Sequence, residues 1–200
     1  MGVKPMARGL LIVFSGPSGV GKGTVRALFA DREELNIAYS ISMTSRAKRE
    51  GETDGVEYHF VTREEFEQAI ANDELLEYAE FVGNYYGTPK AFVERLRDEG
   101  KNVLLEIEVE GATIVKEKCP DALSIFLIPP SMEELERRIR GRKTEPEEVV
   151  QQRLAKAQRE MNMMNRYQYV ICNDDAELAA DIIALIIERY AKAKQQEEEQ

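Results

Sequence analysis

A glycine-rich segment with one lysine carries the residues of this chain best suited to chemistry. The apolar run Leu10–Phe14 leads into Gly16–Thr24, a segment with four glycines and Lys22. Glycines let the backbone turn so that successive amide N–H groups point into one concavity, which suits a phosphate. A helix that begins at about Thr24 would add free N–H groups, and Lys22 a cation for the β- and γ-oxygens of a nucleotide. This setting predicts a phosphate-binding loop rather than a strand-to-helix turn without a ligand.

The residue after Lys22 departs from the usual form of this motif. A serine or threonine that helps to hold magnesium commonly stands there, whereas this chain has Gly23 and places its hydroxyl at Thr24. Mg²⁺ gives up its waters reluctantly. We therefore expect the metal to be held largely through water and nucleotide oxygens, with Thr24 as the candidate protein contact. This variant is typical of kinases that phosphorylate small nucleotides.

A second group of polar residues could bind another phosphate. Ser42 is followed by Arg46, Arg49 and Tyr58. Two arginines three residues apart can surround an anion, because the planar guanidinium binds pairs of oxygens and stays charged. Taken alone, the pattern is equally typical of a solvated basic turn.

Composition limits the kinds of partner. The net charge of −10 argues against nucleic-acid polymers, which need a basic face. Two cysteines without a C-x-x-C pair favour reduced thiols in the cytoplasm. No apolar run approaches the ~20 residues that span a membrane, so we expect no membrane partner.

Apolar runs alternate with helical patterns, which indicates an α/β fold with a parallel sheet. In the strand expected to end at Val109, Glu106 and Glu108 would lie on one face, near the edge where ligands bind in open α/β sheets. The last helix is expected from about Ala176 to Lys192, with residues 193–200 as a fraying tail. The expected core strands are Leu10–Ser15, Ile41–Thr44, Val103–Val109, Leu123–Ile128 and Tyr169–Cys172.

The pattern changes between Ser45 and Thr88. Asp54-Gly55 and Gly83-Asn84 are typical of hairpin turns, and Thr62-x-x-Glu65 is typical of a helix start. We expect a small inserted α+β subdomain here.

Taken in chain order, these motifs resemble guanylate kinase. The resemblance covers residues 9 to 187 and rests on Gly16–Thr24, Ser42, Arg46, Arg49, Tyr58, Glu77, the Gly-Asn-Tyr-Tyr-Gly segment 83–87, Glu106–Gly111 and Pro129–Ser131. It implies a single P-loop domain with a three-layer α/β fold. Its parts would be a core (about 9–40, 89–130 and 165–192), a GMP-binding subdomain (41–88) and a helical lid (131–164).

The resemblance also implies transfer of the γ-phosphoryl group of ATP, bound with Mg²⁺, to GMP. It leaves open the use of dGMP and the oligomeric state. The implied ATP-binding residues are Gly16, Pro17, Ser18, Gly19, Val20, Gly21, Lys22, Gly23, Thr24 and Asn173. The implied GMP-binding residues are Ser42, Arg46, Arg49, Tyr58, Glu77, Tyr86, Thr88, Glu106 and Glu108. The residues expected to balance charge during transfer are Lys22, Arg46, Arg138, Arg142 and Arg153.

Two alternatives remain at this point. A non-catalytic relative could use the acceptor pocket to bind a phosphopeptide, although the intact loop Gly16–Thr24 argues against it. A related kinase could use AMP or a nucleoside as acceptor. Glu77 with Ser42 favours guanine, because a carboxylate accepts hydrogen bonds from the ring N–H and the amino group of that base.

Overall fold

The computed structural model describes residues 7–141 and 146–198 of the chain. Its larger sheet is parallel throughout, with the strand order β2-β7-β1-β8-β9. The predicted α/β fold with a parallel core sheet is confirmed. The strands are β1 (Leu11–Ser15), β2 (Ile37–Tyr39), β7 (Asn102–Glu106), β8 (Leu123–Ile128) and β9 (Tyr169–Cys172).

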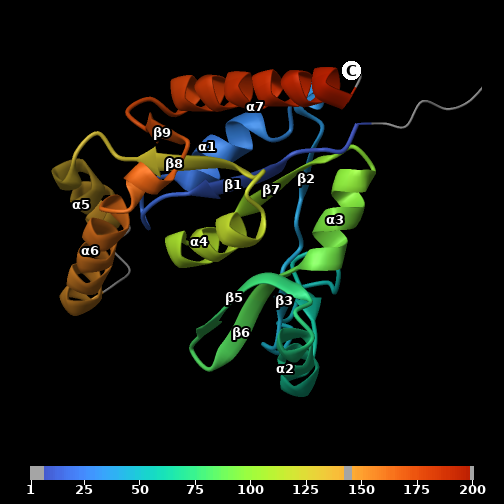
Figure 1. Ribbon diagram of the computed structural model, residues 1–200. Coiled ribbons are helices and arrows are strands. Elements are labelled where there is room, and N and C mark those ends of the chain that lie inside the picture. The colour runs from blue at the N-terminus through green and yellow to red at the C-terminus, as the bar shows by residue number, and fades with distance from the viewer. Residues whose placement is uncertain (1–6, 142–145, 199–200) are drawn as a thin grey trace, which may run out of the picture.

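Helices cover both faces of this sheet and make three layers (Figure 1). Every residue of β1 is buried, as in a strand with helices on both sides. Ile12 and Phe14 pack in the core beneath α1 (Lys22–Phe29) and α7 (Ala176–Glu198). Leu11 and Val13 belong to the opposite core, which contains side chains of α3 (Lys90–Asp98) and α4 (Val109–Lys118).

A smaller sheet lies beside the core, below it in Figure 1. Its strand order is β4-β3-β6-β5; β3 pairs parallel with β4, and the remaining pairs are antiparallel. The capping box predicted at Thr62 is present and begins α2. The elements are β3 (Met43–Thr44), β4 (His59–Phe60), α2 (Arg63–Ala71), β5 (Leu75–Phe81) and β6 (Asn84–Pro89). This is the expected α+β insertion.

Two further helices project from the other side of the core sheet: α5 (Met132–Gly141) and α6 (Glu147–Met161) (Figure 1). They lie in the segment that the resemblance assigns to a helical lid. Short 3₁₀ turns occur at η1 (Glu33–Leu35) and η2 (Met164–Arg166). None of the helices in the described part of the chain is long and apolar enough to cross a membrane.

The structure corrects one predicted core strand. The strand at the edge of the parallel sheet is Ile37–Tyr39, not Ile41–Thr44. Asn102 holds the start of this edge, because its amide group donates to the carbonyl of Leu35 and accepts from the N–H of Leu10. Met43 and Thr44 belong to the smaller sheet.

The strand predicted to reach Val109 ends at Glu106, so Glu106 and Glu108 do not share a strand face. Glu108 is the N-cap residue of α4. Gly111 and the β-branched residues that follow it weaken the local helix signal, but Val109, Ala112 and Val115 are buried against the sheet and stabilise the helix.

The hairpin turn in the smaller sheet and the last helix also differ from expectation. Val82 and Gly83, both at positive φ, form the turn between β5 and β6, and Asn84 already lies in β6. Asp54-Gly55 does not join an antiparallel pair, because β4 lies parallel to β3. The helix α7 continues past the predicted end at Lys192 to Glu198, so the fraying tail expected at residues 193–200 is helical over its described part.

Candidate functional site

The phosphate-binding loop lies between the carboxyl end of β1 and the first residue of α1. Gly19 and Gly21 have φ values of 89° and 98°, which side chains disfavour. Neither has room for a Cβ, which would lie 2.7 Å from Ile139 at Gly19 and 2.7 Å from Asn173 at Gly21. No side chain caps α1, so its first N–H groups remain available to an anion.

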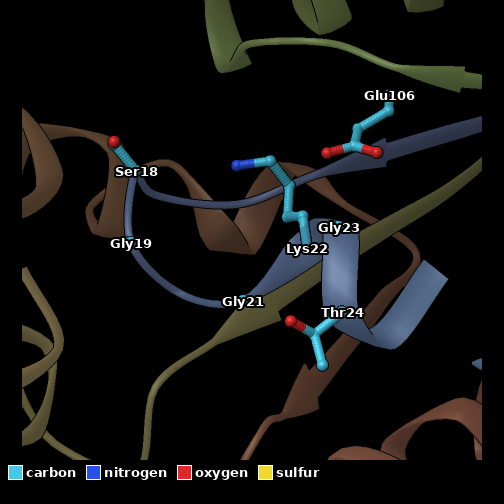
Figure 2. Close-up of a pocket in the computed structure, with 7 residues that line it drawn as sticks. All are labelled: Ser18, Gly19, Gly21, Lys22, Gly23, Thr24 and Glu106. Atoms are coloured by element: carbon cyan, nitrogen blue, oxygen red, sulfur yellow. The ribbon is translucent and has the colours of Figure 1, made fainter. Parts of the chain in front are cut away.

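Lys22 stands at the first position of α1, above the loop. Its Nζ donates to the carbonyl of Gly16 at 2.6 Å and to that of Pro17 at 3.3 Å. Burial lowers the pKa of Lys22, and the charges of Glu106 and Glu160 oppose that effect. The ammonium is therefore held inside the curve of the loop, as Figure 2 shows.

A cavity of about 420 Å³ opens over the loop. Figure 2 shows the carboxylate of Glu106 facing Lys22 across this cavity. Most of the predicted ATP-binding residues therefore surround one space. Its lining residues are Ser18, Gly19, Gly21, Lys22, Gly23, Thr24 and Glu106.

Asn173 is buried and supports the loop from below. Its Nδ2 donates to the carbonyl of Val20 at 2.7 Å, and its own N–H donates to Ile128 at 2.8 Å. The side chain of Asn173, expected to bind ATP, thus makes its hydrogen bond to the loop backbone.

Two of the three predicted lid arginines reach the loop. Arg138, on α5, donates to the carbonyls of Val20 and Asn173 at 3.2 and 3.1 Å. Arg153, on α6, donates to the hydroxyl of Ser18 at 2.8 Å. Arg142 lies outside the described residues.

Glu106 and Glu108, predicted to act together, have separate partners. Glu106 pairs with Arg26 of α1 at 2.9 Å and lines the cavity. Glu108 pairs with Lys156 of α6 at 2.7 Å. Of these two carboxylates, Glu106 is the one that lines the cavity with Lys22.

The donor set of the cavity suits a metal ion brought by a nucleotide. The hydroxyl of Thr24 and the carboxylate of Glu106 are hard oxygen donors, which Mg²⁺ prefers. Within residues 7–141 and 146–198, no cluster of three histidine, cysteine or acidic side chains could hold a metal ion by itself.

Two of the three residues expected to contact guanine touch each other in the smaller sheet. The hydroxyl of Thr88, on β6, contacts the carboxylate of Glu77, on β5, where the register of these two strands shifts between Leu75 and Tyr78. The third residue, Ser42, directly precedes β3, whose Met43 pairs with Gly87 on β6.

Glu77 is a buried carboxylate of the smaller sheet, with 8% of its surface exposed. Its Oε1 accepts a hydrogen bond of 2.6 Å from the hydroxyl of Thr88. Burial raises the pKa of Glu77, and the bond from Thr88 opposes that rise. A hydroxyl that fixes one carboxylate oxygen gives the acceptor a defined orientation.

The predicted phosphate-binding set gathers around Arg46. The rings of Tyr58 and Tyr86 lie 5.8 Å apart, and the guanidinium of Arg46 lies 5.5 Å from the ring of Tyr58. Arg49 is exposed, and its backbone N–H donates to Glu52 at 2.7 Å. A carboxylate, Glu52, binds both terminal nitrogens of Arg46 at 2.7 and 3.0 Å. This pairing lowers the pKa of Glu52 to about 2.

Sequence reasoning did not identify Glu52, Arg26 or Glu160 as part of the site. Glu52 occupies the fork of Arg46 as a phosphate would. Glu160, on α6, is 8% exposed, and burial raises its pKa, while the charges of Lys156 and Lys22 lower it. No local signal distinguishes these three residues from other charged ones. Glu52 lies in a loop, and the groups that link Arg26 and Glu160 to the site, Glu106 and Lys22, come from other parts of the fold.

Comparison with known proteins agrees with this geometry. The family model described as guanylate kinase matches residues 8–190. A guanylate kinase of Lactococcus lactis subsp. lactis is 58% identical over 181 residues, 90% of this chain and 88% of the relative. One from Bacillus cereus is 57% identical over 180 residues, with 90% and 88% covered. The crystal structure of guanylate kinase from Anaplasma phagocytophilum aligns with a TM-score of 0.68 at 38% identity, over 92% of this chain and 87% of that one.

Proposed function

The chain belongs to the guanylate kinase family and is a nucleoside monophosphate kinase, and we propose that it transfers the γ-phosphoryl group of ATP to GMP. An oxygen of the GMP phosphate attacks the γ-phosphorus. The bond from that phosphorus to the β,γ-bridging oxygen breaks, and ADP and GDP leave. The observation that carries the proposal is a phosphate-binding loop combined with a buried carboxylate, Glu77, that Thr88 orients on a separate sheet.

On the donor side, the loop would bind the phosphates of ATP through its backbone N–H groups. Lys22 would exchange its present bonds to Gly16 and Pro17 for phosphate oxygens. Arg138 and Arg153 extend toward the loop from the lid helices and would neutralise the migrating group. Phosphoryl transfer depends mainly on such positioning and charge balance.

On the acceptor side, Arg46, Tyr58 and Tyr86 would bind the phosphate of GMP. Glu52 now accepts two hydrogen bonds from the guanidinium of Arg46. The phosphate of GMP therefore has to displace this carboxylate and accept the same pair of hydrogen bonds in its place. Glu77 would accept hydrogen bonds from the N1–H and the amino group of guanine. A buried acceptor of this kind rejects adenine, because adenine leaves it unpaired.

Mg²⁺ would supply charge neutralisation between the β- and γ-phosphates when ATP binds. Thr24 and Glu106 would hold it, Glu106 through water. The ion pair with Arg26 would orient the carboxylate of Glu106 for this role.

We also place the enzyme in the cytoplasm. Both cysteines, Cys119 and Cys172, are unpaired thiols. Unpaired thiols are typical of a reducing compartment.

The test is ADP formation from Mg-ATP with GMP, AMP, CMP and UMP as parallel acceptors. Strong turnover with GMP alone is the expected result. Turnover with AMP at a comparable rate would contradict the role given to Glu77. A folded protein that turns over none of them would be a binding module instead.

A further inference from the structure

Gly111 lies in a helix, and its backbone conformation does not require a glycine. It lies in the first turn of α4, and its φ is not positive. Alanine favours helix more than glycine does, so the helix by itself would be better formed with a side chain here. The reason for glycine has to come from the surroundings.

The side chain that a Cβ at Gly111 would meet first is that of Glu77. A Cβ at Gly111 would lie 2.8 Å from Oε2 of Glu77, 3.3 Å from its Cδ and 3.4 Å from its Cγ. Those are the three nearest atoms, and all belong to this residue. Helix α4 thus lies directly against the carboxylate, above β5 in the view of Figure 1.

The carboxylate has little freedom to move away. Glu77 is 8% exposed, and Thr88 holds its Oε1 at 2.6 Å. A methyl group at position 111 would therefore rotate the carboxylate and disturb its bond to Thr88. The negative charge also lies at the N-terminal turn of α4, where the helix dipole favours it.

We propose that Gly111 is a positioning residue for base selection, whose missing side chain lets Glu77 take the orientation that distinguishes guanine from other bases. The inference rests on the proposed function, in which Glu77 accepts from guanine. Gly111 acts through Glu77.

The experiment compares GMP with IMP, which lacks the 2-amino group of guanine. Steady-state kinetics are measured for the wild type, for Gly111→Ala and for Glu110→Ala, an exposed neighbour in the same helical turn that serves as control. We expect Gly111→Ala to raise KM for GMP about ten- to hundred-fold, as for misaligned hydrogen bonds to a charged acceptor. The GMP-to-IMP ratio of kcat/KM should fall with it, while KM for ATP and the melting temperature stay near wild type.

A second pair of variants separates positioning from folding. In Glu77→Ala there is no carboxylate to displace, so adding Gly111→Ala should change KM for GMP no further. If Gly111→Ala keeps the wild-type KM and the wild-type GMP-to-IMP ratio, the proposal is wrong. If adding Gly111→Ala to Glu77→Ala raises KM for GMP as much as Gly111→Ala does alone, the proposal is likewise overturned. A wild type that does not phosphorylate GMP would refute the proposed function itself, and this inference with it.

Discussion

Replacing Asn173 tests whether this residue contacts adenine or shapes the phosphate-binding loop. In the structure its Nδ2 donates to the carbonyl of Val20 at 2.7 Å, and only 5% of the residue is exposed. In Asn173→Ala the carbonyl keeps its bond from Arg138 at 3.2 Å, so no acceptor is left without a partner. We therefore expect a modest loss of unfolding free energy, about 0.5–1.5 kcal/mol. This corresponds to a fall in melting temperature of roughly 1–6 °C for a chain of this size.

Asn173→Asp should be worse than Asn173→Ala, although it is closer in size. A carboxylate oxygen would replace the donor and face the Val20 carbonyl oxygen at a distance near 2.7 Å. Two acceptors then oppose each other in a buried place, and the new charge is desolvated. The loop should be displaced, and KM for ATP should rise more than in the alanine variant.

Inorganic tripolyphosphate, which carries phosphates but no base, decides between the two roles. Its inhibition constant against ATP is measured for the wild type, both Asn173 variants and the exposed control Asn165→Ala. If Asn173 supports the loop, its replacement should weaken the binding of tripolyphosphate and of ATP by the same factor. For Asn173→Ala this factor should be about five- to tenfold, as for one lost buried hydrogen bond. Unchanged tripolyphosphate inhibition with a raised KM for ATP would refute this reasoning and indicate that Asn173 contacts adenine.

Three other substitutions test the remaining parts of the site. Lys22→Ala should lower turnover at least about a hundredfold with an unchanged circular dichroism spectrum; near-normal ADP release would remove Lys22 from the mechanism. Burial raises the pKa of Glu77 above 4.5, so the folded state binds that proton more tightly and loses stability as pH rises through the raised pKa. Urea unfolding should therefore show wild type losing stability relative to Glu77→Gln from pH 4.5 upward, and a constant difference would contradict the shift. The pKa of Glu52 is about 2, so the contribution of its ion pair to stability is present above pH 4.5 and lost toward pH 2. Glu52→Gln should also lower KM for GMP, because it releases Arg46. An unchanged KM would show that Glu52 does not compete with phosphate.

Local sequence was sufficient for the features that depend on neighbouring residues. The apolar run before Gly16–Thr24 predicted the central strand, and the spacing of glycine and Lys22 predicted the loop. The capping box at Thr62 was predicted for the same reason, because its donor and acceptor are three residues apart. Guanylate kinase membership could also be inferred from motifs in chain order, because their residue types and sequence are visible without coordinates.

Only the tertiary structure decided which residues face one another. Whether Glu108 lies on a strand or caps a helix depends on the burial of Val109 and Val115 against the sheet, which local propensity does not report. The pairing of Glu52 with Arg46, the support of Val20 by Asn173 and the contact between Gly111 and Glu77 depend on how loops and sheets meet. The chain thus encodes its phosphate loop locally, while the orientation of the charged groups around it follows from packing over long sequence separations.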